Sequence, residues 1–509
     1  MTATTTVTPP PPDGEAAVFL EVAAAIGRRL AMTAVWNGDR CNWLGWAYHA
    51  EGERITPVYR AMGPALGDGT AGIGLFLAEL WRATGDPLVR QAARGALAHA
   101  ARHLDDGGGA VADGLYTGRS AAAIAFTLAA RALGDEQWDE AARLALSGLS
   151  NTVTKPQPPD LYGGRAGAAL ALLDAAAAAN DTALRTAAFA HGRQLVESAR
   201  RGPHGASWAT APDQPHPDLV GGPHGAGGIA VALLELHAAG GDEAFRDTAL
   251  SALAYETAHF DPHWRLWPDL RLDAGPANLL AANPARYPVA WVHGAVGVGL
   301  VRLRLRTLLP ERAETDAEIR DAVNAALATL VPPALPAISF AQASGAAGNA
   351  AFVLQAAAAL GQPEWRDYAL YAARHGVQAH AAPRVPWPCG GPPNGETPNL
   401  LFGLAGIGRF YLELADPERV RSLLTFTPRP QPADLPVPVA PPPAPEPPEP
   451  EPPAPEPLPS PPVETEKAAE TPKEHGATPR KPTARPRKPR GTRTRKTTPG
   501  TSDKDDTTK

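Results

Sequence analysis

The sequence contains few cysteines, only Cys41 and Cys389 among 509 residues. Two cysteines cannot form the disulfide framework of a small secreted protein, and such scarcity is typical of a reducing compartment. No apolar run in the sequence approaches the roughly 18–20 residues that a membrane-spanning helix needs. The N-terminal stretch MTATTTVTPPPPDGE has neither a basic start nor an apolar centre, so it does not look like a signal peptide. We therefore expect a cytoplasmic protein with no transmembrane segment.

Charged residues make up only 20% of the chain, and the net charge is −6. Proline with scattered glutamate dominates residues 428–463, a composition that predicts a disordered, extended segment. Residues 480–496 carry nine Lys and Arg and no acid, so this run could bind nucleic acid or an anionic surface. Since no aromatic residues interleave with these charges, a solubilising tail is the simpler alternative. We predict a disordered N-terminus (1–14), one globular domain (15–426) and a disordered tail, Pro-rich and then basic (427–509).

A short element rich in glycine and alanine occurs seven times, with starts 46 to 69 residues apart. Six copies read G-x-x-G, and the second has Ala121 at the fourth place. Each is followed by apolar residues at helical spacing and then by a second helical stretch, such as 87–104 or 136–150. Seven stacked two-helix units would bury one continuous core, although an ordinary all-α protein with many Ala–Gly contacts is the alternative. The copies begin at Gly69, Gly118, Gly164, Gly225, Gly294, Gly345 and Gly403.

The copies resemble those of the LanC-like family, the lanthionine synthetase cyclases. The closing copy, GETPNLLFGLAGIGRFYLEL at 395–414, carries the most specific similarity, and the resemblance extends over about residues 36–416. It implies an all-α fold, the α/α-toroid, in which seven inner helices lie inside seven outer helices with the glycine motifs at one mouth. It also implies an activity, the addition of a peptide cysteine thiolate to dehydroalanine or dehydrobutyrine to form a thioether ring.

Histidines directly precede the first glycine of the fourth and fifth copies, as His224 and His293, and Ser344 precedes that of the sixth. If the copies share one mouth, these side chains face a common space. The resemblance assigns proton transfer to His224 and to Asp160, four residues before the third copy, and histidine titrates near neutral pH. We therefore predict Asp160, His224 and His293 as catalytic residues. The alternatives are a helix N-cap for Asp160 and structural roles for the two histidines.

The resemblance also raises the question of a metal. Zinc-dependent members carry Cys at the fifth copy and Cys-His at the sixth, which leaves one zinc position open for the substrate thiol. This sequence has Val292, Ala343 and Ser344 at those positions, so we expect the family zinc to be absent and no other cofactor to be bound. The arginine expected four residues before the first ligand is Pro288 here, with Arg286 close enough to replace it.

A few other residues could in principle form a replacement metal site. His224, His293 and Cys389 are candidate ligands, and His259 with His263 forms an i, i+4 pair, but such pairs are common by chance. Cys389 as a nucleophile would need a nearby base and a lowered pKa. We predict neither arrangement.

Three functional classes remain open. The first is a thioether-forming cyclase, zinc-independent or degenerate, that acts on a substrate or leader peptide. A separate dehydratase or kinase partner would supply dehydration, because the chain has no such region. The second is a non-catalytic peptide-binding scaffold of a modification complex. The third is a carbohydrate-processing enzyme of the six-hairpin glycosidase-like toroids, which need two carboxylates, for which Asp160 is the evident candidate and Glu396 and Asp68 are weaker ones. We favour peptide modification.

Overall fold

The computed structural model describes residues 14–51, 54–104, 113–149, 153, 155–210, 216–274, 284–390 and 395–426. All of them belong to one compact unit, Met1–Pro442. The predicted disordered tail and, apart from Gly14, the predicted disordered N-terminus lie outside the described residues. Among the helices that are described, none is long and apolar enough to cross a membrane.

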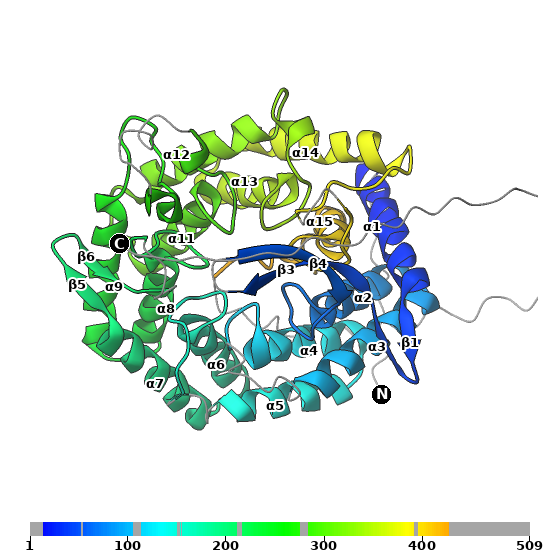
Figure 1. Cartoon of the computed structure of the whole chain (residues 1–509), viewed down its shortest axis with the longest axis horizontal. Helices are drawn as coiled ribbons and strands as arrows, with labels where there is room; N and C mark the ends of the chain where they lie inside the picture. Colours follow the sequence, from blue (N-terminus) through cyan, green and yellow to red (C-terminus); the bar gives the residue numbers. More distant parts are fainter. Residues whose placement is uncertain are drawn as a thin grey trace, which may run out of the picture. The chain divides into compact units, whose positions relative to one another are not determined.

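The described residues form fourteen α-helices, arranged as an inner and an outer ring (Figure 1). Each inner helix packs against the next, and the last inner helix closes the circle on the first. This arrangement confirms the predicted α/α-toroid. The inner helices are α2 (Thr70–Thr84), α4 (Gly118–Leu133), α6 (Arg165–Ala179), α8 (Ala226–Ala238), α11 (Ala295–Leu308), α13 (Ala346–Leu360) and α15 (Leu404–Ala415). The outer helices are α1 (Gly14–Thr33), α3 (Pro87–His103), α5 (Gln137–Leu149), α7 (Thr182–Ser198), α9 (Glu243–Ala258), α12 (Thr315–Thr329) and α14 (Glu364–Gly376).

The G-x-x-G pattern has a steric cause at the start of the inner helices. A Cβ on Gly72 would lie 2.0 Å from the carbonyl oxygen of Leu66, and one on Gly406 would lie 1.7 Å from that of Leu400. No side chain fits where the preceding loop crosses the first helical turn so closely. In the second copy, which has Ala121 at the fourth place, the carboxylate of Asp113 accepts the N–H of Arg119 at 2.9 Å.

In each copy, one residue lies two positions before the first glycine. Backbone hydrogen bonds of 2.8 to 3.1 Å join these residues from copy to copy. We call this chain of bonds the mouth belt. Six bonds join seven residues, and the seventh link, between Pro223 and Val292, has no donor because proline lacks an N–H. The belt is therefore open between the two copies that carry His224 and His293. From donor to acceptor, the six bonds are Tyr162 to Pro223, Tyr116 to Tyr162, Gly67 to Tyr116, Leu401 to Gly67, Ala343 to Leu401 and Val292 to Ala343.

Three short antiparallel hairpins accompany the helices, and the sequence analysis did not predict them. Asn37 pairs with Arg40, so the loop between β1 and β2 is Gly38-Asp39, and Gly38 at φ +64° supplies the left-handed residue at the first position of this two-residue turn. Figure 1 shows the β3–β4 hairpin drawn across the middle of the ring. Its base rests on the loop before α15, where the Thr397 hydroxyl donates to the carbonyl of Trp46 at 3.1 Å. The strands are β1 (Val35–Asn37), β2 (Arg40–Asn42), β3 (Leu44–Glu51), β4 (Arg54–Ala61), β5 (Arg200–Gly202) and β6 (Gly205–Ser207).

After α15 the chain turns back into the ring, where Leu423, Leu424 and Phe426 are each at most 2% exposed. The Tyr116 hydroxyl donates to the carbonyl of Leu423 at 2.7 Å, and the Trp291 indole N–H donates to that of Leu424 at 3.1 Å. The Phe426 ring stacks on Trp291 with centroids 6.3 Å apart. This C-terminal segment, residues 416–426, therefore supports the loops of the second and fifth copies from within the ring.

Candidate functional site

An aspartate and a histidine from adjacent copies meet in a direct hydrogen bond. The Nδ1 atom of His224 lies 2.7 Å from Oδ2 of Asp160, which is 6% exposed. The other oxygen of Asp160 accepts the N–H of Gly163 at 2.9 Å. Gly164, rather than Asp160, is the N-cap of α6 and makes no side-chain cap, so the N-cap alternative for Asp160 is wrong. Because a carboxylate only accepts hydrogen bonds, Nδ1 of His224 carries the hydrogen and Nε2 remains available as a base.

His293 lies directly beside this pair. Its ring stacks on that of His224 with centroids 5.3 Å apart and planes 25° apart, and the Tyr162 ring lies 4.9 Å from His224. Burial, then the charges of Arg271 and His224, lower the pKa of His293 to about 3. His293 is therefore neutral near pH 7, beside a second imidazole that is held by a carboxylate. The structure brings together all three residues that the sequence predicted as catalytic.

An ion pair that no sequence motif predicted lies next to His293. The guanidinium of Arg271 contacts the buried carboxylate of Asp269 at 2.6 and 2.9 Å. Although burial alone would raise it, this guanidinium, together with His293, holds the pKa of Asp269 below its usual value. Arg286, suggested by the sequence as a replacement arginine, contacts instead the hydroxyl of Tyr287 at 3.3 Å. Asp269 directly precedes the short 3-10 helix η2 (Leu270–Ala274), and Arg271 lies within it, where no motif marks either residue.

A buried carboxylate on the outer helix α9 positions the loop that carries His224. One oxygen of Glu256 accepts the N–H groups of Gly221 and Gly227, at 2.6 and 3.1 Å. Its other oxygen lies 2.6 Å from the guanidinium of Arg302 on α11, and both side chains are fully buried. This network ties the fourth copy to the fifth, across the place where the mouth belt is open.

The residues at the family's zinc-ligand positions do not fit a zinc ion. Val292 and Ala343 offer only aliphatic side chains, and the hydroxyl of Ser344 is a weak ligand. The Val292 N–H donates to the carbonyl of Ala343 at 3.1 Å, so these two positions are adjacent in space. Across the described ranges, no three His, Cys, Asp or Glu side chains cluster closely enough to hold a metal ion.

The other residues that the sequence offered as alternative ligands or nucleophiles make different contacts. His259 follows the end of α9 and its Nδ1 contacts the carbonyl of Tyr255 at 2.9 Å, so it does not share a helix with His263. Burial raises the pKa of both thiols, Cys41 and Cys389, to about 12. Neither cysteine is therefore a ready nucleophile at neutral pH.

The two additional carboxylates considered for carbohydrate chemistry are also constrained. Glu396 forms an ion pair with Arg29, one contact of which is 2.8 Å, and accepts the N–H of Trp387 at 2.9 Å. Burial raises the pKa of Asp68, although the charge of Arg60 opposes this effect. Glu396 is thus committed to holding the outer helix α1 against the loop before α15.

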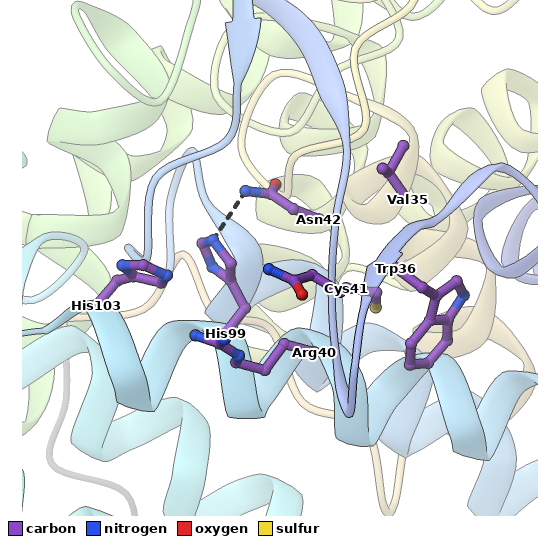
Figure 2. A pocket seen from close by; sticks show the side chains of 8 residues that line it. Val35, Trp36, Arg40, Cys41, Asn42, His99 and His103 are labelled. Carbon is purple, nitrogen blue, oxygen red and sulfur yellow. Dashed lines mark hydrogen bonds between the residues drawn. The ribbon is translucent and has the colours of Figure 1, made fainter.

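A second histidine pair lies on α3, outside the predicted site. The amide nitrogen of Asn42 lies 2.9 Å from Nε2 of His99 (Figure 2), and Nδ1 of His99 lies 3.0 Å from the hydroxyl of Thr70. Burial, then the neighbouring charges of His103 and Arg40, lower the pKa of His99 to about 4. This ring is therefore neutral at pH 7, with both nitrogens engaged.

Comparisons with known proteins show what this chain is similar to. The family description "Lanthionine synthetase C-like protein" matches residues 60–425. Among solved structures, nisin cyclase is similar at 17% identity with a TM-score of 0.53, over 71% of this chain and 90% of that one. The unsaturated glucuronyl hydrolase of Bacillus sp. GL1 is similar at 16% identity and a TM-score of 0.35, over 62% of this chain and 83% of that one. The comparison with curated proteins found no match.

Proposed function

Because the chain belongs to the lanthionine synthetase C-like family, we propose that it forms thioether rings in a dehydrated peptide without a zinc site. The observation that carries this proposal is the hydrogen-bonded pair Asp160–His224 with His293 stacked on it. A separate partner would dehydrate the peptide first. A cytoplasmic location, expected from the scarcity of cysteine, is part of the proposal.

The reaction needs one proton to be moved twice. Nε2 of His224 takes the proton of the substrate thiol, and the thiolate sulfur then forms a bond to Cβ of the dehydroamino acid. The electron pair of the Cα–Cβ double bond moves onto an enolate, and the proton returns from His224 to Cα. Atoms and charge balance, and no other reactant is required. Asp160 orients His224 and stabilises its protonated form, and such acid–base assistance contributes about 10²–10⁴-fold in rate.

Two neighbouring groups suit the same chemistry. His293 stays neutral beside His224, so the pair carries one positive charge, not two, when His224 is protonated. Arg271, although paired with Asp269, acts electrostatically on His293, so its guanidinium lies near enough to donate to the enolate oxygen as negative charge develops there. These residues supply by acid–base and electrostatic means what a zinc–thiolate would otherwise provide.

The test uses a peptide that contains one cysteine and one dehydroalanine. Ring closure is followed by mass spectrometry as the loss of an alkylatable thiol, with and without a zinc chelator. We expect the native protein to accelerate closure and the chelator to have no effect. His224→Ala should lower the rate by about 10²–10⁴-fold and Asp160→Asn by a similar or smaller factor. His263→Ala, on an exposed loop, is the matched control and should behave like the native protein.

A non-catalytic scaffold is the competing function, and the missing zinc ligands favour it. Its signature would be tight binding of the dehydrated peptide, measured by fluorescence anisotropy, with ring closure no faster than for the peptide alone. In that case His224→Ala would change neither the affinity nor the rate. That result would replace the cyclase proposal with the scaffold.

A further inference from the structure

A cavity of about 640 Å³ lies next to the candidate site. Its walls come from the chain that follows β4, from the end of α3 and from the loops before α4 and α6. They include Met62, Ala65, His103, Leu104, Tyr162 and Gly163. The volume falls in the range of about 300–1,000 Å³ that is usual for ligand sites, so the cavity holds more than one side chain.

The cavity and the candidate site share a wall. The ring of Tyr162 lines the cavity and lies 4.9 Å from the ring of His224. Gly163, also in the wall, donates its N–H to Asp160. Side chains two residues apart on an extended peptide are about 7 Å apart on one face. A peptide that reacts at His224 therefore has a neighbouring side chain within reach of the cavity.

The walls of the cavity are mainly apolar, and no Asp, Glu, Lys or Arg is among the described residues that line it. His99 belongs to the wall, and both of its ring nitrogens are engaged, by Asn42 and Thr70. The His103 ring packs against it with centroids 4.4 Å apart. A smaller hollow of about 240 Å³ continues from this pair past Arg40 and Trp36 (Figure 2). Arg40 lines only the smaller hollow, although its charge acts on His99, which belongs to both walls.

We propose that this cavity selects the substrate peptide by receiving a large apolar side chain, aromatic or branched aliphatic, located near the reacting residue. The inference rests on the proposed function, because it takes the occupant to be the same peptide. It adds a specificity determinant that is separate from the groups that move the proton. The apolar wall, the volume and the shared residues Tyr162 and Gly163 together favour this occupant over a charged one.

The test compares two peptides that differ only two positions from the dehydroalanine, one with leucine and one with glycine. For the native protein we expect the leucine peptide to have about tenfold higher kcat/KM, since burying one such side chain is worth that factor or more. Ala65→Leu narrows the cavity from its wall, so the ratio should fall toward one. Ala313→Leu, at an exposed position before α12, is the matched control and should keep the native ratio. Thermal unfolding of both variants checks that each is folded.

A binding measurement separates this inference from the proposed function. The same two peptides are made with serine in place of cysteine, so that they cannot react, and their Kd values are measured by anisotropy. A leucine preference that Ala65→Leu abolishes supports the cavity even if the protein does not accelerate ring closure. An equal Kd for both peptides, or a preference that Ala65→Leu leaves intact, overturns the cavity while leaving the cyclase proposal standing.

Discussion

Two sides of one mouth, built from the same repeated element, differ sharply in chemistry. At the fourth and fifth copies, His224 and His293 stack together beside Asp160. At the sixth copy, the corresponding residues are a fully buried alanine, Ala343, and Ser344. Both sides are built from the same glycine-led helix starts, but they carry different side chains, and the mouth belt is open only on the histidine side. The fourth and fifth copies carry the residues that we propose as proton-transfer groups, whereas the family's metal-ligand positions in the fifth and sixth copies are Val292, Ala343 and Ser344.

The supporting contacts differ in the same way. On the histidine side, the mouth belt is open at Pro223, and the buried pair Glu256–Arg302 bridges the gap. On the opposite side the belt is continuous, and the buried pair Arg409–Glu79 joins α15 to α2 with contacts of 2.8 and 3.0 Å. Buried charges persist only when they are paired, so both networks hold helices in place. Of the two networks, only the Glu256–Arg302 pair also binds the loop that carries His224, a predicted catalytic residue.

The largest effect on the contrast between the two sides of the mouth should come from introducing metal-ligand side chains at the family's zinc positions. A triple variant, Val292→Cys with Ala343→Cys and Ser344→His, should bind about one zinc per chain, because positions 292 and 343 are already joined by a backbone hydrogen bond. Elemental mass spectrometry of the tag-free protein measures the metal. The native protein should contain far less than one zinc per chain, and near-stoichiometric zinc there would contradict the loss of the site. A folded triple variant without metal would mean that the three side chains do not converge.

The next test separates the two buried ion pairs. Glu256→Gln and Glu79→Gln should each destabilise the fold by about 3 kcal/mol, because each leaves a buried arginine short of a partner. Denaturant unfolding measures this cost. Only Glu256→Gln should also slow ring closure, since Glu256 holds the loop of His224 through Gly221 and Gly227. Equal rates for the two variants at full folding would show that Glu256 has a structural role alone.

The repeated helices of the ring could be predicted from the sequence because the steric constraints that define each repeat act between residues close together in the chain. Glycine is required at the fourth place of six copies because a Cβ there would clash with a carbonyl oxygen a few residues away, as between Gly72 and Leu66. The repeat can therefore be recognised in the amino-acid sequence itself. The placement of His224 and His293 followed from the same register, since each immediately precedes a first glycine.

What the sequence did not reveal depends on contacts between distant segments. The C-terminal segment reaches Trp291 across more than a hundred residues, through a hydrogen bond to Leu424, and nothing in its composition predicts that position. Arg271 lies outside any repeat, so its approach to His293 could not be read from register. The cavity beside Tyr162 likewise combines segments that only the closed ring brings together.

A smaller effect is expected from the burial of His293. Its pKa is about 3 in the folded protein and about 6.5 when unfolded, so the folded state binds fewer protons in between. Stability should therefore fall as the pH drops below about 6.5, by up to about 2 kcal/mol between pH 7 and pH 5 from this residue. His293→Gln should lose that part of the pH dependence in urea unfolding. His263→Ala, at an exposed position, should keep it, and an unchanged slope in His293→Gln would mean that this ring is protonated at little cost.

The smallest effect should come from Ser344, which occupies the place of a metal ligand without acting as one. Its carbonyl accepts the hydroxyl of Ser339 at 3.1 Å, and that contact does not depend on the Ser344 side chain. Ser344→Ala should therefore change the rate of ring closure by less than about twofold, within the scatter of about 0.5 kcal/mol that is usual for a substitution outside a critical contact. The same assay that detects the loss in His224→Ala measures it. A large loss in Ser344→Ala would place a working hydroxyl on the side of the mouth that we regard as inactive, and the contrast between the two sides would no longer hold.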